Sequence, residues 1–258
     1  MKTTRTSPSR KATARAQPVL DGLRLAVTTL TVVPLRVGTV DRRAAAVAMS
    51  VAPLVGALLG LVLAGVFVLL GQSPVAAAVT VAAGVLLTRG LHLDGLADTV
   101  DALGSYRDSA GALEIMKKPD IGPFGVAAIA LALLIQFTAL TELGPGAIVA
   151  GWATGRLAIT LACRRGVPPA RPQGLGALVA STVPLPILTA AAAAVGAGAI
   201  WAVPGRPWQG PAAVAGSLLV AFFLVRHCVR RFGGVTGDVL GAATEVTTTV
   251  ALITLSLS

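Results

Sequence analysis

The chain has 258 residues, of which 55% are hydrophobic and only 12% are charged. A soluble globular domain usually carries about twice that share of charged residues, so the composition argues for a membrane protein. The formal net charge of +10 is accompanied by no nucleic-acid-binding motif, and basic cytoplasmic loops explain it instead. The two cysteines, Cys163 and Cys228, cannot form a disulfide framework and lack metal-ligand spacing.

The N-terminal region is polar before it becomes apolar. Residues 1–18 are basic and contain no apolar core of a signal peptide, which indicates a disordered cytoplasmic tail. Residues 19–35 are mildly apolar but contain Asp21 and Arg24. We therefore expect an interfacial or re-entrant helix there and not a full membrane span.

Seven apolar segments follow, most of them close to the roughly 20 residues that a helix needs to cross the hydrocarbon core. They lie at about 44–70, 75–91, 124–141, 147–163, 178–203, 211–226 and 239–257. The segments predict an all-α, polytopic bundle with about seven transmembrane helices, and six or eight would also fit. Their many Gly and Ala residues permit either homo-oligomers or tight packing within one chain.

Basic residues alternate between the linkers of this bundle. Two or more Lys or Arg occur in each of the linkers 36–43, 92–123, 164–176 and 226–238, whereas the linkers 71–74, 142–146 and 204–210 together contain only Arg206. This alternation predicts that the N-terminus and the basic linkers face the cytoplasm. Most acidic residues fall on the same side, so a polar site should open to the cytoplasm.

A stripe of carboxylates follows the second apolar segment. The stretch LHLDGLADTVD, residues 91–101, contains Asp94, Asp98 and Asp101 in a chain with only 11 acidic residues. On a helix these three side chains fall within about 60° of one another. Because like charges repel, and more strongly near a membrane, we expect a divalent cation to offset them. Oxygen ligands favour Mg²⁺, Mn²⁺ or Ca²⁺ over zinc. A solvated acidic helix end is the alternative.

A second acidic pair lies near the C-terminus, in the stretch GGVTGDVLGAATEV. Asp238 and Glu245 are seven residues apart and share a helix face. The neighbouring glycines, which would let a ligand or phosphate approach the backbone, are Gly233, Gly234, Gly237 and Gly241. Helix packing through small residues, with Asp238 as N-cap, is the alternative, but it leaves an acid inside the bilayer unexplained.

Basic side chains and histidines accompany the acidic stretches. Topology alone explains most of them, including Lys118, Arg164 and Arg165. The arginines that best suit phosphate contacts are Arg89, Arg156 and Arg171, because a guanidinium group matches phosphate oxygens. His92 and His227 suit general bases or structural roles equally well. Carboxylates, a divalent metal, glycine turns and arginines together indicate phosphoryl chemistry at the membrane surface.

Four stretches resemble the cobalamin synthase family, the adenosylcobinamide-GDP ribazoletransferases, which are integral-membrane enzymes acting late in vitamin B12 assembly. They occur in the family's order as GLHLDGLADTVDALGS (90–105), EIMKKPDIGPFG (114–125), ARPQGLGA (170–177) and GGVTGDVLGAATE (233–245). The segments between them match in hydropathy and not in identity. The first and last stretches are long and specific to the family.

The resemblance implies a Mg²⁺-dependent transferase of the bacterial cytoplasmic (inner) membrane. The 3′-hydroxyl of α-ribazole, or of its 5′-phosphate, would attack the cobinamide-side phosphorus of adenosylcobinamide-GDP. GMP would leave, and adenosylcobalamin or its 5′-phosphate would form. Residues 19–258 would then be a single transmembrane catalytic domain whose partners are these two substrates and the lipid bilayer, with no nucleic acid.

The resemblance also implies roles for individual residues. The expected catalytic residues and metal ligands are Asp94, Asp98, Asp101 and Asp238. The expected substrate-binding residues are Arg89, His92, Lys117, Arg156, Arg171, Gly234, Gly237 and Glu245. At Met116–Asp120 the chain departs from the family pattern, because acid and base exchange places, and the roles of Lys118 and Asp120 stay open.

Two other classes of protein share some of these features. A CDP-alcohol phosphatidyltransferase also pairs aspartates with Asp-Gly at a membrane face, but Asp98 stands here where that pattern has arginine. A cation-coupled transporter would spread its acidic residues across the bilayer, whereas here they gather at one face.

Overall fold

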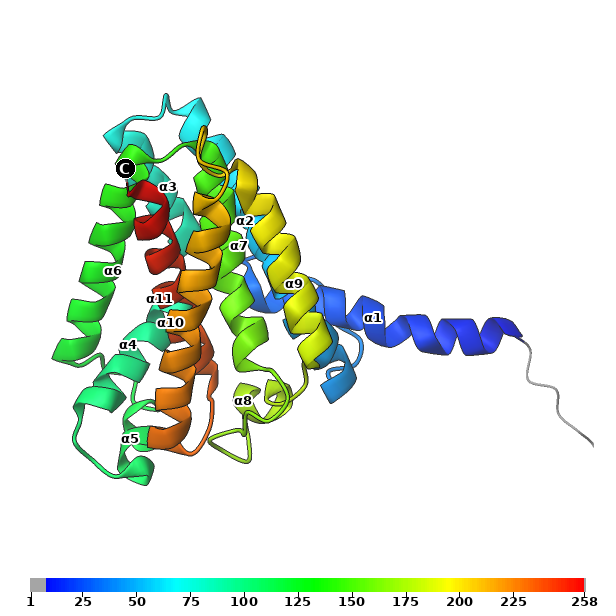
Figure 1. The fold of residues 1–258 in the computed structure, drawn as a ribbon. Coiled ribbons are helices and arrows are strands. Elements are labelled where there is room, and N and C mark those ends of the chain that lie inside the picture. The colour runs from blue at the N-terminus through cyan, green and yellow to red at the C-terminus, as the bar shows by residue number, and fades with distance from the viewer. Residues whose placement is uncertain (1–7, 258) are drawn as a thin grey trace, which may run out of the picture.

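The computed structural model describes residues 8–257, with side chains from residue 17 onward, and confirms the all-α prediction (Figure 1). Its helices are α1 (Pro8–Leu30), α2 (Arg42–Leu69), α3 (Pro74–Leu87), α4 (Leu91–Gly104), α5 (Ser109–Ile115), α6 (Pro123–Glu142), α7 (Pro145–Ala162), α8 (Leu175–Val179), α9 (Leu185–Gly198), the 3₁₀ turn η1 (Ala199–Trp201), α10 (Gln209–Phe232) and α11 (Gly237–Ser256). The long helices run side by side, and α4, α5 and α8 lie together at the lower end of the bundle in Figure 1.

The number of membrane spans is lower than the seven expected. Within the described residues, α2, α6, α10 and α11 are each long and apolar enough to cross a membrane. The pair α3 and α4 passes only as one broken span or re-entrant loop, which raises the total to five. The segment 147–163 forms α7, which carries a charged residue, and 178–203 forms the short apolar helix α9 with η1. The described helices therefore indicate a multi-pass membrane protein with four candidate spans, or five if α3 and α4 form one broken span.

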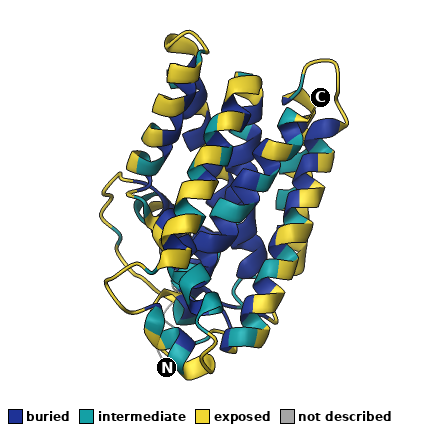
Figure 2. Cartoon of the chain, turned by 90° about the vertical axis from the view of Figure 1, so that its left-hand side faces the viewer, coloured by how far each residue is buried: buried dark blue, intermediate teal, exposed yellow. Residues whose placement is uncertain are grey.

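Helix α7 is central to the bundle although it is less apolar than the spans. Nearly every side chain from Ala147 to Ala162 is buried, because α2, α10 and α11 surround the helix. Small residues permit this packing: a Cβ on Gly56 of α2 would lie 2.5 Å from the carbonyl oxygen of Trp152, and one on Gly60 would lie 2.7 Å from the Cα of Val149. The buried centre and the exposed outer faces are visible in Figure 2.

Helix α1 leaves the bundle at its N-terminal end (Figure 1). The tail expected to be disordered over residues 1–18 is helical from Pro8, and residues 1–7 lie outside the described part of the chain. The far end of α1 extends away from the other helices (Figure 1). Its near end is fastened by Asp21, whose carboxylate accepts hydrogen bonds from the amides of Gly38 and Thr39.

A sharp break after α3 directs α4 across the bundle. Arg89 and Gly90 both adopt a positive φ, 57° and 66°, and the axes of α3 and α4 differ by 85°. Gly90 takes up this left-handed conformation without a steric penalty. The break changes the direction of the chain, so that α4 packs against α11 and α6.

Candidate active site

The aspartates of α4 form the centre of the site. Asp94 is exposed, Asp98 and Asp101 are half-buried, and α4 lies outside the four long spans. Burial raises the pKa of Asp98 to about 7, and the nearby charges of Asp94, Asp238 and Asp101 act in the same direction. The ion pairs among the described side chains are Arg24 with Asp21 and Lys117 with Glu114, so no basic side chain directly neutralises this face.

The start of α11 is pressed against α4 through two glycines. A Cβ on Gly95 would lie 2.7 Å from the carbonyl oxygen of Asp238, and one on Gly241 would lie 3.1 Å from the Cα of Gly95. Thr236 is the N-cap of α11, since its hydroxyl accepts a hydrogen bond from the amide of Val239. Asp238 therefore stands in the first turn of α11, and its charge reaches Asp98.

The stretch 114–125, which we call the strap, connects α5 to α6 and contacts both acidic helices. The carboxylate of Asp101 accepts hydrogen bonds from the amides of Gly122 (2.7 Å) and Gly125 (2.9 Å). At the other end of the strap, Met116 is buried with its sulfur 3.8 Å from the Thr236 hydroxyl. Both oxygens of Asp101 are thus occupied by backbone, which the prediction of a metal ligand did not anticipate.

The loop before α8 packs against the turn before α11. The amide of Ala170 donates to the carbonyl of Val235, and the amide of Val235 donates to that of Pro168. A side chain on Gly234 would overlap the backbone of Pro169 and Ala170, so this glycine permits close packing. Arg171 follows the pairing and donates a hydrogen bond to the carbonyl of Leu113. The four stretches singled out in the sequence therefore meet in one region.

Asp238 lines two cavities that differ in polarity. One has a volume of about 180 Å³ and a polar lining that includes Arg171, Gln173 and Thr236. The other, about 250 Å³, is mostly apolar; its lining includes Asp94, Met49 and Ile159. Gly237 and Asp238 line both, so a ligand could place a charged group in one cavity and an uncharged group in the other.

The carboxylates do not form a ready-made metal cage. No group of three or more His, Cys, Asp or Glu side chains in the described part of the chain is close enough to hold a metal ion. The donors nevertheless fit Mg²⁺, because proteins usually hold this ion through one or two carboxylates together with substrate phosphates and water. Asp94, Asp98 and Asp238 meet that requirement, since Asp98 is within the field of both other charges.

Several of the expected substrate-binding residues lie elsewhere or are already engaged. Arg89 donates to the carbonyl of Thr28 and ties the α3–α4 break to α1. Lys117 forms an ion pair of 2.6 Å with Glu114. His92 is buried on α4, and neither ring nitrogen has a hydrogen-bond partner in the structure. Arg171 is the expected arginine that lines a cavity together with Asp238, and His92 lines the second cavity beside Asp94 and Asp238.

Arg156 and Glu245 belong to a polar cluster inside the bundle. Both line an interior cavity of about 10 Å³ between α6, α7 and α11. The carboxylate of Glu245 accepts a hydrogen bond from the amide of Gln136 on α6, which also donates to the Thr249 hydroxyl. Arg156 is only 2% exposed, so its guanidinium group lies in the interior and not on the face that carries Asp94.

Three contributors to the site were missed in the sequence. Thr236 caps α11, Met116 contacts that cap, and Gln136 binds Glu245. A signal existed only for Gln136, which is a lone amide within the apolar segment 124–141. The roles of Thr236 and Met116 depend on contacts between distant segments, and no local pattern reveals those.

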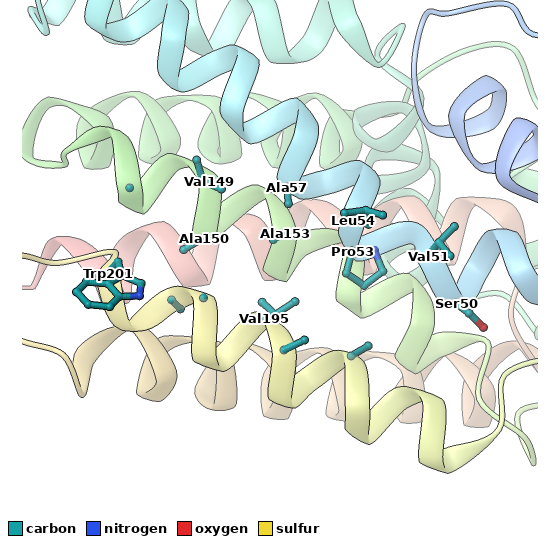
Figure 3. Close-up of a pocket in the computed structure, with 15 residues that line it drawn as sticks. Ser50, Val51, Pro53, Leu54, Ala57, Val149, Ala150, Ala153, Val195 and Trp201 are labelled. Carbon is teal, nitrogen blue, oxygen red and sulfur yellow. The ribbon is translucent and has the colours of Figure 1, made fainter.

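The largest cavity described is an apolar groove and not part of this site. It has a volume of about 570 Å³ and lies between α2, α7 and α9. Trp201 stands at one end and Ser50 at the other, with Ala57, Ala153 and Val195 between them (Figure 3). No charged residue lines the groove, so it offers no group that could bind a phosphate or a metal.

Comparisons with known proteins show the family of the chain. Residues 22–256 match the family model of cobalamin-5-phosphate synthase, CobS. A protein of Frankia casuarinae named adenosylcobinamide-GDP ribazoletransferase is 43% identical over 264 residues, covering 91% of this chain and 94% of the relative. A protein of the same name from a Nocardioides species is 42% identical, and the match covers 90% of this chain and 97% of the relative. Another, from Corynebacterium efficiens, is 39% identical, and the match covers 90% of both chains. No solved structure matches the chain. The match to nearly the whole chain, together with the similarity to these relatives, establishes that the chain belongs to the cobalamin-5-phosphate synthase family.

Proposed function

We propose that this protein is an adenosylcobinamide-GDP ribazoletransferase, which joins α-ribazole or its 5′-phosphate to adenosylcobinamide-GDP. Membership of the family and the names of the relatives support this reaction. The observation that carries the proposal is the meeting of Asp94, Asp98 and Asp238 beside a cavity that contains Arg171. Such a set of groups suits a substrate with a diphosphate.

The reaction exchanges one phosphorus–oxygen bond for another. The 3′-oxygen of the ribazole attacks the cobinamide-side phosphorus, and the bond from this phosphorus to the bridging oxygen breaks. The electron pair of that bond leaves with GMP, and a carboxylate of α4 that does not hold the metal takes the hydroxyl proton. When bound, Mg²⁺ would neutralise the diphosphate and stabilise the departing GMP.

The residues of this chain would orient the two substrates around Asp238. Arg171 can bind phosphate oxygens in the polar cavity, because the guanidinium group offers several donors and only one bond to Leu113 is formed. The second, apolar cavity that Asp238 lines suits the uncharged base of the nucleoside. Asp94 and Asp238 would hold Mg²⁺ between these two positions, with Asp98 beside them.

The site is proposed to face the cytoplasm of a bacterial inner membrane. The basic linkers 92–123, 164–176 and 226–238 lie at the same end of the bundle as α4, α5 and α8 (Figure 1). Lys and Arg concentrate on the cytoplasmic side of membrane proteins. Soluble phosphorylated substrates would then reach the site directly from the cytoplasm.

Release of GMP provides the test of this function. Purified protein in liposomes should release GMP from adenosylcobinamide-GDP when α-ribazole and Mg²⁺ are both present, and should form a corrinoid that contains the ribazole. Omitting α-ribazole or chelating Mg²⁺ should abolish the release. Glu142→Gln, at the C-terminal end of α6 and outside the linings of both cavities, serves as a control and should retain full turnover. Folded protein that releases no GMP would refute the assignment.

A further inference from the structure

We propose that Asp101 is a positioning residue that fastens the strap to α4, and that it is not a metal ligand. The proposal rests on the function proposed above, since it concerns how the same site is assembled. It begins from the two backbone hydrogen bonds that the carboxylate of Asp101 accepts at the N-terminus of α6, from Gly122 and Gly125.

Asp101 supplies from another helix the cap that α6 lacks. Gly122 is the N-cap of α6 and has no side chain with which to satisfy the free amides of the first turn. In a capping box, one side chain binds the amide at the third helical position and a second binds the N-cap amide. The carboxylate of Asp101 binds both, because Gly125 occupies the third position and Gly122 the N-cap. Its negative charge also suits the positive end of the helix dipole.

The two glycines are required by this contact. A Cβ on Gly122 would lie 2.5 Å from one carboxylate oxygen of Asp101, and a Cβ on Gly125 would overlap the other oxygen. Pro123, between them, has no amide to satisfy. The sequence Gly-Pro-Phe-Gly therefore presents two amides to Asp101, with no side chain at either position that would obstruct the carboxylate.

Both oxygens of Asp101 are directed into this contact, which opposes a role in metal binding. Among the described residues, the side chains of Asp94, Asp98 and Asp238 accept no such hydrogen bond from an amide of the strap. A metal that recruited Asp101 would have to compete with two charge-assisted hydrogen bonds at the start of a helix. Asp94, Asp98 and Asp238 are therefore free to act on the substrate, whereas Asp101 holds the strap.

Fastening the strap also affects the second half of the site. Met116, at the other end of the strap, contacts Thr236, which caps α11 directly before Asp238. The carbonyl of Leu113, one residue before the strap, accepts the hydrogen bond from Arg171. Asp101 therefore holds in place a segment that contacts the start of α11 and adjoins the anchor of Arg171.

The test compares a change at Asp101 with a change at its glycine partner. Asp101→Asn removes one acceptor oxygen, and Gly125→Ala obstructs the carboxylate without altering any acidic residue. Both variants should lower kcat/KM for adenosylcobinamide-GDP about tenfold or more, because displaced groups lose their alignment. Both should leave unchanged the Mg²⁺ concentration that gives half-maximal turnover. Asp94→Asn serves as the ligand control and should raise that concentration.

Two measurements without turnover separate this proposal from the proposed function. In lipid nanodiscs, hydrogen exchange of the amides between residues 120 and 126 should become about tenfold faster in both variants. Mn²⁺ binding, followed by electron paramagnetic resonance, should match that of the wild type. Gly144→Ala, at a glycine with open space around it, should change neither quantity. Two results would overturn the positioning role: weaker Mn²⁺ binding in Asp101→Asn but not in Gly125→Ala, or an unchanged hydrogen-exchange rate of the strap amides in both variants. Neither result depends on which reaction the wild type catalyses.

Discussion

The carboxylate of Asp98 lies close to the charges of Asp94, Asp101 and Asp238, and burial together with these charges raises its pKa to about 7. A raised pKa means that the folded state disfavours the ionised carboxylate. Asp98 therefore lowers the stability of the folded state above pH 7, where the group is ionised in both the folded and the unfolded chain. A residue kept in spite of this cost is expected to serve function.

Replacing Asp98 should separate activity from stability. We expect Asp98→Asn to lower turnover by about 10² or more, because the carboxylate that accepts the hydroxyl proton beside the metal is lost. The thermal midpoint in detergent at pH 8 should stay equal or rise, since the repulsion among carboxylates is relieved. Wild-type turnover together with an unchanged midpoint would indicate a solvated acidic face and no metal site.

At the scale of elements, the contact between α4 and α11 brings the two halves of the site together. Gly95 and Gly241 let the two backbones approach until a Cβ on Gly95 would lie within 2.7 Å of the Asp238 carbonyl. The apolar pattern of each helix indicates which face is buried, but neither pattern specifies this partner. The carboxylates meet because two helices with small residues at the crossing can approach closely.

Adding one methyl group at this crossing should impair catalysis. Gly95→Ala is expected to push α4 away from α11 and to lower kcat/KM at least tenfold, because small displacements of reacting groups are costly. Gly65→Ala on α2, where no atom lies within 4 Å of the added Cβ, is the matched control and should keep full turnover. Equal turnover in both variants would contradict the role given to this crossing.

For the whole molecule, polar groups inside the bundle connect three helices. Arg156 on α7, Glu245 on α11 and Gln136 on α6 line one small cavity, and Gln136 donates to Glu245. Arg156 and Glu245 were expected to bind the substrate, and the structure places Arg156 in the buried core. A charged residue in such a place needs an opposite charge nearby, and here the carboxylate of Glu245, from another helix, lines the same cavity as Arg156.

Removing one member of this cluster should destabilise the fold. Arg156→Met leaves Glu245 without an opposing charge, and we expect a loss of about 3 kcal/mol in unfolding free energy. Adding Glu245→Gln should recover part of that loss, since no lone charge then remains buried. Thermal unfolding of the two single variants and the double variant in detergent forms the cycle that measures this coupling. Strictly additive effects would show that the two charges are independent.

Local patterns were sufficient to predict the class of the protein and the stretches that form its site. Hydropathy indicated an all-α membrane protein, and four motif stretches indicated the family; both predictions are confirmed. Hydropathy also predicted more spans than the four or five candidates among the described helices, because an apolar helix such as α9 has the composition of a span without its length. The choice of ligands among the aspartates stays a prediction.

The sequence by itself determined that three aspartates share one face of α4 and that Asp238 begins another helix, since both follow from helical periodicity and motif order. Only the tertiary structure decided how each carboxylate is used. Asp101 caps α6 because the strap folds back onto α4, and Glu245 binds Gln136 because α11 packs on α6. These contacts join residues that are 21 and 109 positions apart, and at such separations the packing of the whole bundle selects the partner.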